Sequence, residues 1–385
     1  MNMSLIYLDN NATTRVAPEV FEAMRPFFTD RWGNAASLHR FGADNRHAID
    51  IARKQVADLL HAQRPSEILF TSGGTESNQL AIRGVLAATP EKKHLITSQV
   101  EHASVLALCK ELEKTGWKVD ILPVNSQGEL DPDSVLKALR PDTALVTLMG
   151  ANNETGVVFP IEKIAPLCAK AGVPLHVDAT QVCGKLPLEL SRTPIALLSL
   201  SSHKLHGPKG MGALYVRRGT PIKPIFFGGS QERGLRPGTE NCAGIVGLGL
   251  AAELASTHLT APSTLATLRD RMESAILTQF PFAKLNGSLH RLPNTSSIRF
   301  EGLDGEAICL LLSEQNVAAS TGSACSAGSL EPSHVLTAMG LKNHAAKGTV
   351  RLSLSRETTP DAIDRFLQIL PPIIERLQRQ QNRTR

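Results

Sequence analysis

The strongest constraint on the fold is an alternation, from about residue 65 to residue 230, of short β-rich runs with longer helical patterns. The short runs are mostly apolar, which is typical of strands buried in a parallel sheet that helices cover on both faces. Buried strands are expected at 68–71, 95–97, 119–122, 144–148, 175–178, 197–200 and 213–216, and helices at 75–88, 104–115, 133–139 and 161–171. The pattern therefore predicts an α/β fold with a mostly parallel, seven-stranded sheet.

The pattern changes after Gly249. A stretch with Ser, Thr and Pro over 256–264 leads into a mixture of helix and strand, which ends in a long helical pattern over 361–380. A chain of 385 residues is long enough for two domains. We therefore expect a domain boundary in this region, with a smaller second domain after it.

Composition narrows the classes of function. Hydrophobic residues make up 42% and charged residues 20% of the chain, which excludes disordered and fibrous proteins. The net charge of +5 comes from both signs scattered along the chain, and aromatic residues are only 4%, so no direct nucleic-acid partner is expected. No apolar run approaches the ~18 residues of a membrane helix. An acid at Asp9 precedes any long apolar stretch, which argues against a secretory signal. The six scattered cysteines include no C-x-x-C pair, which argues against a zinc site or a disulfide framework. We expect a cytoplasmic protein with no membrane partner and no metal site.

Polar residues that follow strands are the first candidates for a site, because ligands of open α/β sheets bind where strands end. The turn TSGGTE (71–76) ends a strand and begins a helix, whose first N–H groups and dipole favour an anion. It matches neither a P-loop nor G-x-G-x-x-G, so a single phosphate group fits better than a nucleotide. An ordinary turn with a helix cap is the alternative.

Asp178 and Lys204 each follow a predicted strand, 26 positions apart, so both are expected to line one crevice. The buried carboxylate needs a partner; it is either a helix cap or ion pair, or the anion that keeps a proton on the ring nitrogen of pyridoxal phosphate. Lys204 stands in SSHKLHGPKG (201–210), where a partly desolvated amine suits covalent attachment of an aldehyde cofactor. A surface loop is the alternative, and His203 with His206 as a metal pair has no Cys or carboxylate nearby to complete it.

Cys325 lies in TGSACSAGS (321–329), a run of small side chains. We expect a mobile, exposed loop that presents one thiol, as a nucleophilic cysteine requires. Cys168 and Cys309 lie inside apolar helical patterns and are expected to be buried in the core.

Together these segments resemble the cysteine desulfurases of the NifS and IscS family, which are pyridoxal-phosphate enzymes of the class V aminotransferase group. The resemblance runs the length of the chain in the family's order, and it is carried by YLDNNATT (7–14), FTSGGTESN (70–78), EH (101–102), NNETG (152–156), SHK (202–204), RPGTEN (236–241) and GSAC (322–325). It implies the type I fold of pyridoxal-phosphate-dependent transferases. A large cofactor-binding domain would span 15–255, and a small α+β domain, formed by 1–14 and 256–385, would carry the Cys325 loop.

The resemblance also implies a role for each matching residue. Lys204 would bind pyridoxal 5'-phosphate covalently, Asp178 would face its pyridine nitrogen, and His102 would stack on its ring and help to move protons. The remaining ligands would be Gln181 and Asn153 at the phenolic oxygen, and Gly74, Thr75, Ser201 and His203 at the phosphate, with Thr239 reaching it from the other subunit of a homodimer. Asn34 and Arg351 would bind the substrate carboxylate, a task that suits a bidentate guanidinium.

The implied reaction converts L-cysteine to L-alanine and leaves the sulfur on Cys325 as a persulfide, which passes to an acceptor such as an iron–sulfur scaffold protein. The runs 204–206 and 325–336 resemble NifS-like members, which serve nitrogenase cluster assembly. Selenocysteine lyase and another class V aminotransferase are the alternatives with the same cofactor; a plain aminotransferase needs no thiol such as Cys325. A catalytically silent scaffold is a third reading, and the retained Lys204, Asp178 and His102 speak against it.

Overall fold

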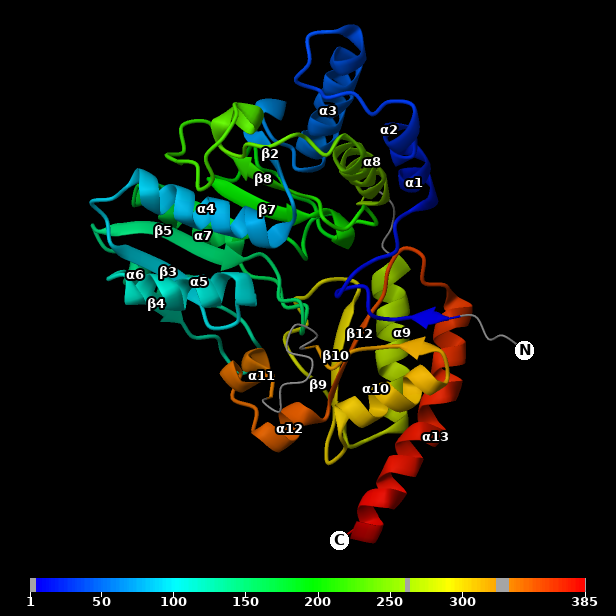
Figure 1. The fold of residues 1–385 in the computed structure, drawn as a ribbon. Coiled ribbons are helices and arrows are strands. Elements are labelled where there is room, and N and C mark those ends of the chain that lie inside the picture. Colours follow the sequence, from blue (N-terminus) through cyan, green and yellow to red (C-terminus); the bar gives the residue numbers. More distant parts are fainter. Residues whose placement is uncertain (1–4, 260–263, 323–331, 385) are drawn as a thin grey trace.

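The computed structural model describes residues 5–259, 264–322 and 332–384 (Figure 1). Its main sheet has seven strands in the order β2-β8-β7-β6-β5-β3-β4. Their bounds are β2 Ile68–Thr71, β3 His94–Ser98, β4 Lys118–Leu122, β5 Thr143–Met149, β6 Leu175–Asp178, β7 Leu197–Ser201 and β8 Gly212–Val216. Only the two pairings made by β8 are antiparallel, so the predicted seven-stranded, mostly parallel sheet is confirmed.

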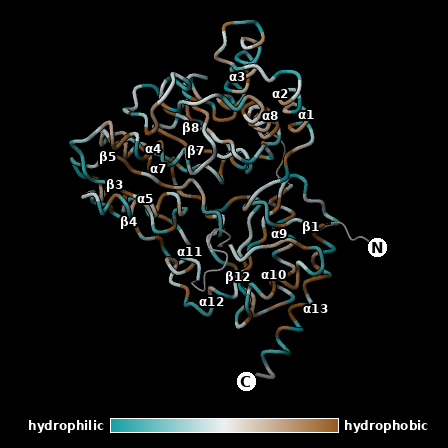
Figure 2. Tube along the Cα trace, viewed as in Figure 1, coloured by the Kyte–Doolittle hydropathy of each residue, from teal (hydrophilic) through white to brown (hydrophobic). Residues whose placement is uncertain are grey.

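Helices cover both faces of this sheet, as Figure 1 shows. Successive strand residues alternate between two hydrophobic clusters: Leu69 packs with α4 (Gly74–Ala88) and α5 (Ala103–Lys114), whereas Phe70 packs on the opposite side. That second cluster includes α3 (Arg40–Leu59), α6 (Pro132–Ala138), α7 (Ile161–Lys170) and α8 (Cys242–Leu259). In Figure 2 the hydrophobic stretches lie in the interior of the fold, and hydrophilic ones are frequent on the outer loops. The period of two along each strand is what builds the three layers.

Three expectations need correction. The strand at 119–122 is not buried on both faces, because β4 is an edge strand and Ile121 is 39% exposed. Cys168 is buried in α7, but Cys309 is only partly buried. The helix α8 has 18 residues and is apolar enough to cross a membrane, contrary to the expectation that no run was long enough. Half of it is buried inside the fold, where it packs on α3 and α1 (Pro18–Met24), so its apolar composition is that of a core helix.

A second unit contains a three-stranded antiparallel sheet, β12-β10-β9, and a two-stranded parallel sheet, β1-β11. The strands are β1 Ile6–Tyr7, β9 Ala283–Leu285, β10 Thr295–Phe300, β11 Val317–Ala318 and β12 Thr349–Ser353, and the helices are α9 Thr264–Gln279, α10 Gly305–Glu314 and α13 Pro360–Thr384. They share a hydrophobic cluster of their own, which Ile6 and Leu8 join from the start of the chain.

Three short helices complete the fold: α2 Pro26–Thr29, α11 His334–Ala338 and α12 Asn343–Lys347. Val335, Leu336 and Ala346, from α11 and α12, pack into the cluster of the main sheet rather than that of the second unit. The division into 15–255 and 1–14 with 256–385 stays a prediction.

Candidate active site

One cavity of about 470 Å³ lies at the carboxyl ends of the parallel strands. Its size is typical of a site for a small molecule or cofactor. Ten of the predicted site residues line it together: Gly74, Thr75, His102, Asn153, Asp178, Gln181, Ser201, His203, Lys204 and Arg351. They come from elements far apart in the sequence, including β12 of the second unit.

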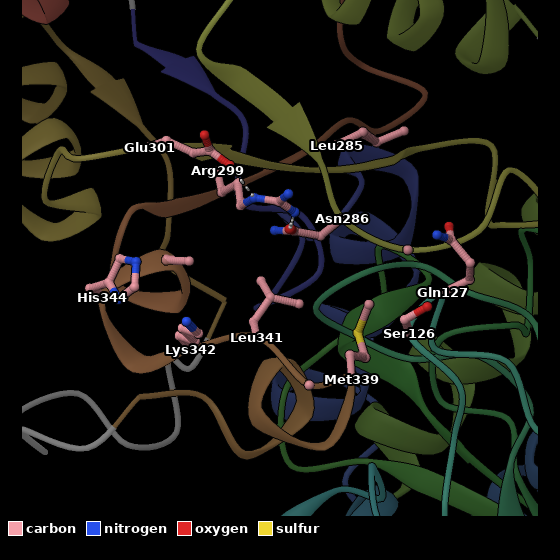
Figure 3. A pocket seen from close by; sticks show the side chains of 13 residues that line it. Ser126, Gln127, Leu285, Asn286, Arg299, Glu301, Met339, Leu341, Lys342 and His344 are labelled. Atoms are coloured by element: carbon pink, nitrogen blue, oxygen red, sulfur yellow. Dashed lines mark hydrogen bonds and ion pairs between the residues drawn. The ribbon is translucent and has the colours of Figure 1, made fainter.

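A second hollow, of about 410 Å³, lies away from these residues, and none of the predicted site residues lines it. Figure 3 shows Arg299 in it between Glu301 and Asn286. The guanidinium donates to Asn286 Oδ1 at 2.9 Å and to Glu301 Oε1 at 3.4 Å, so this cation is paired within the chain. The first cavity is therefore the candidate active site.

The start of α4 forms one end of the cavity. Gly73, the residue before α4, has φ +151°, a conformation that favours glycine. A Cβ on Gly74 would lie 3.0 Å from Thr180 Oγ1 and 3.6 Å from Ser201 Cβ. Glycine at 74 thus leaves room for an anion beside the first amides of a helix of 15 residues. Burial, together with Lys204 and Lys209, lowers the pKa of nearby His203 to about 4, so its ring is neutral in this cationic surrounding.

Asp178, the last residue of β6, is 6% exposed and fixed by two donors. Its Oδ2 accepts from Asn78 Nδ2 at 2.7 Å, and its Oδ1 accepts from the backbone N–H of Thr180 at 3.0 Å. Two hydrogen bonds, one from a side chain, offset part of the cost of burying this carboxylate. Asn78, in the quoted motif FTSGGTESN, was not among the predicted site residues.

A directed chain of hydrogen bonds links Asp178 to His102. Asn78 Nδ2 donates to Asp178 and also to Ser104 Oγ at 3.0 Å, and Ser104 Oγ lies 2.9 Å from His102 Nδ1. Because His102 Nδ1 accepts from the Ser104 N–H at 3.1 Å, this nitrogen is the acceptor, and the Ser104 hydroxyl donates to it. The neutral ring of His102 therefore carries its proton on Nε2.

Lys204 ends a 3₁₀ turn, Ser202–Lys204, that follows β7. Its Nζ donates to the carbonyl oxygens of Asn11 and, at 2.8 Å, of Ala12. Asn11 is 1% exposed and contacts two more residues of the site. Its backbone carbonyl oxygen also accepts from Gln181 Nε2 at 3.0 Å, and its side-chain Nδ2 donates to the carbonyl oxygen of Asn153 at 3.1 Å. Asn11 belongs to the quoted motif YLDNNATT, but only the structure shows that it holds the lysine and the glutamine.

Arg351, in β12, is almost completely buried. Its guanidinium pairs with Asp9 at 2.6 Å and donates to the carbonyl oxygens of Asn153 at 3.0 Å and Gly322 at 3.2 Å. Its Nε has no partner in the described part of the chain. The group is thus held in place at the wall of the cavity, where it can meet an anion.

Two buried glutamates adjoin the cavity and were not predicted. Burial raises the pKa of Glu101 to about 8, although Ser98 Oγ and the Met149 N–H donate to it at 2.6 and 2.9 Å. Burial also raises the pKa of Glu154, which accepts from Ser333 Oγ at 2.5 Å. Both belong to quoted motifs, EH (101–102) and NNETG (152–156), but only their burial in the fold shows that their pKa values are raised.

Three predicted residues are not placed at this cavity. Asn34 is exposed in the turn before α3, where its Oδ1 accepts from the Ala36 N–H at 2.8 Å. Thr239 is also exposed, and it borders a different hollow on the surface. Cys325 lies outside the described residues, so the predicted loop over 321–329 is described only at Thr321 and Gly322. Among the described residues, no group of three or more His, Cys, Asp and Glu side chains is arranged to hold a metal ion.

The donor set fits pyridoxal phosphate. The helix start with its glycine cradle suits a phosphate, the buried Asp178 suits a protonated ring nitrogen, and the amine of Lys204 lines the same cavity. Each role stays a prediction.

The chain matches the Aminotransferase class-V family over residues 6–366. A cysteine desulfurase of Nostoc sp. (strain PCC 7120) is 53% identical over 377 residues, which cover 97% of this chain and 94% of that protein. The cysteine desulfurase NifS of Azotobacter vinelandii is 52% identical, with the same coverage. A solved structure described as a NifS-like protein has a TM-score of 0.91 at 37% identity and covers 97% of this chain and 100% of its own. The likeness confirms the expected type I fold, and the chain belongs to the class-V aminotransferase family of pyridoxal-phosphate-dependent enzymes, within its group of NifS-like cysteine desulfurases.

Proposed function

We propose that this protein converts L-cysteine to L-alanine and transfers the sulfur to Cys325 as a persulfide. The observation that carries the proposal is the convergence, in one cavity, of a helix start for a phosphate, a buried carboxylate, a lysine amine and a buried arginine. One similar solved structure, 40% identical, is titled SspA in complex with cysteine, which supports L-cysteine as the substrate.

In this proposal Lys204 would bind the cofactor covalently and Asp178 would face its pyridine nitrogen, and its phosphate would be held by Gly74, Thr75, Ser201 and His203. Gln181 and Asn153 are the ligands of the phenolic oxygen. When bound, pyridoxal phosphate supplies an electron sink that weakens the bond between Cβ and Sγ of the substrate.

The chain's own groups then divide the work. Arg351 orients the substrate by its carboxylate, with Asn34 as the second proposed ligand. Lys204 Nζ takes and returns the proton at the substrate Cα, since it is the amine that lines the cavity. His102 would stack on the ring of the bound cofactor, and its Nε2–H is the proton that this histidine can give to the substrate, because Ser104 already donates to Nδ1.

Sulfur transfer is a nucleophilic step of Cys325. Its thiolate attacks the substrate Sγ, the new S–S bond forms as the Cβ–Sγ bond breaks, and the electron pair stays with Cβ, which takes up a proton to give alanine. Gly322, three residues before Cys325, lines the cavity, which supports delivery of the thiol to this place.

A homodimer is part of the proposal, with Thr239 completing the phosphate site of the neighbouring subunit. Thr75 borders both the cavity and the surface hollow that Thr239, Phe226 and Phe227 line. Phe227 is 89% exposed in the single chain, and exposed aromatic side chains of this kind are typical of interface anchors. An active monomer after dilution would contradict the dimer.

The protein is proposed to be cytoplasmic and to pass sulfur to an acceptor such as an iron–sulfur scaffold protein.

The test is a product assay on the purified, cofactor-loaded protein given L-cysteine. Alanine and sulfide in equal amounts, in the presence of a reductant, support the desulfurase. A keto acid in place of alanine moves the function to transamination, and turnover of selenocysteine alone moves it to selenocysteine lyase.

A further inference from the structure

A second lysine, Lys185, contacts two residues that line the cavity, Gln181 and Asn11, and takes no part in the proposed chemistry. It follows Gln181 by four residues and is partly buried. Its Nζ donates to Gln181 Oε1 at 2.7 Å and to Asn11 Oδ1 at 3.3 Å. Lys185 is thus tied to two residues that contact Lys204 or the cavity directly.

These contacts fix the orientation of the Gln181 amide from both ends. A charged lysine only donates, so the atom 2.7 Å from its Nζ is the amide oxygen. The carbonyl of Asn11 only accepts, so the atom 3.0 Å from it is the amide nitrogen. One N–H of Gln181 is used by Asn11, and the second is left for a ligand in the cavity that Gln181 lines.

We propose that Lys185 is a positioning residue that locks the Gln181 amide with its NH₂ group toward the cavity, so that Gln181 presents an N–H donor to the phenolic oxygen of the bound cofactor. The inference rests on the proposed function for the identity of that ligand. Without Lys185 only the Asn11 carbonyl holds the amide, so it costs less for the amide to turn and offer its oxygen to the phenolic oxygen, which removes an attraction and adds a repulsion.

The charges around Lys185 agree with this role. Burial, then Lys204 and Arg351, lower its pKa to about 7, and the Cys183 thiol opposes that effect. Asp178, Glu154 and His203 line the same cavity. The anionic groups of a bound cofactor favour the charged form of Lys185, so the lock tightens when the site is filled.

The test reads the cofactor without substrate. The visible absorption of the loaded protein changes with pH as the bound cofactor loses a proton. A donor at the phenolic oxygen stabilises the deprotonated state, so we expect Lys185→Met to raise the midpoint of that change by about one pH unit or more. Lys185→Arg, which keeps donors and charge, restores the wild-type midpoint. Lys163→Met, an exposed lysine on α7, leaves it unchanged.

A double-variant cycle separates positioning from a direct effect of charge. Gln181→Met alone should raise the midpoint, and Lys185→Met should add little in that background. An unchanged midpoint in either single variant, or shifts that add in the double variant, overturns the proposal. If Lys185→Met does not bind the cofactor, the midpoint of Gln181→Met still tests the proposal, because an unchanged midpoint in that variant overturns it. Because no turnover is measured, these results stand apart from the product assay: a protein that forms no alanine refutes the proposed function and leaves the midpoints to decide this inference.

Discussion

The hydrogen-bond chain from Asp178 to His102 makes a quantitative prediction for Asn78→Ala. Asn78 is 1% exposed and donates to the Asp178 carboxylate at 2.7 Å and to Ser104 Oγ at 3.0 Å. A hydrogen bond to a charged group contributes ~1.5–3 kcal/mol and a neutral one ~0.5–1.5 kcal/mol to stability. The variant also leaves Asp178, which is 6% exposed, with a hydrogen bond from the Thr180 N–H. We expect the free energy of unfolding of the cofactor-free protein to fall by about 2–4 kcal/mol.

A double-mutant cycle in urea isolates the contact with the carboxylate. In an Asp178→Ala background, Asn78→Ala should cost at least about 1.5 kcal/mol less than in the wild type, because the charged acceptor is gone. Gln79→Ala is the matched control on the same helix: Gln79 Nε2 donates to Ser104 O at 3.0 Å, and it should be additive with Asp178→Ala. Additivity of Asn78→Ala and Asp178→Ala to within ~0.5 kcal/mol would refute the reasoning.

Two further variants test single groups of the site. Burial raises the pKa of Glu101 from 4.5 to about 8, so between these pH values the folded protein keeps a proton that the unfolded chain loses. The stability that this group contributes is therefore present below pH 4.5 and is lost as pH rises toward 8. Glu101→Gln should therefore unfold with a flatter pH dependence over that window in denaturant titrations; equal slopes would contradict this. Arg351→Lys replaces a forked donor with a point charge, so KM for L-cysteine should rise by roughly tenfold or more, equivalent to ~1.4 kcal/mol, with the cofactor spectrum unchanged. An unchanged KM would remove Arg351 from the carboxylate site.

The sheet was predictable because its strands are short apolar runs between helical patterns, and all seven were found. Two expectations were wrong for different reasons. Strand order decides that β4 lies at the edge of the sheet, whereas the apolar length of α8 is readable from the sequence and only its packing partners are not. Position in the sheet and packing on α3 are tertiary facts.

The site was predictable to the level of residue types at strand ends. Their partners were not, because Asn78 and Asp178 are 100 positions apart and their contact exists only in the fold. The same holds for the protonation of Glu101, which depends on complete burial. Lys185 stands only four residues after Gln181, but 181–185 forms turns rather than a helix, so the spacing alone did not predict their contact. Asn34 and Thr239 do not reach the cavity of their own chain, and their roles stay predictions.

The most direct test of the central claim is to locate the sulfur. The cofactor-loaded protein is treated with L-cysteine without reductant, and its thiols are then blocked. The protein is digested, and the masses of its peptides are measured by mass spectrometry. We predict the mass of one added sulfur atom on the peptide that contains Cys325, with one alanine formed for each, and neither product from Cys325→Ala. The other cysteines serve as internal controls, since burial raises the pKa of Cys109, Cys168, Cys183, Cys242 and Cys309 and so keeps them as thiols. Added sulfur on one of those five, or alanine from Cys325→Ala at the wild-type rate, would contradict the assignment.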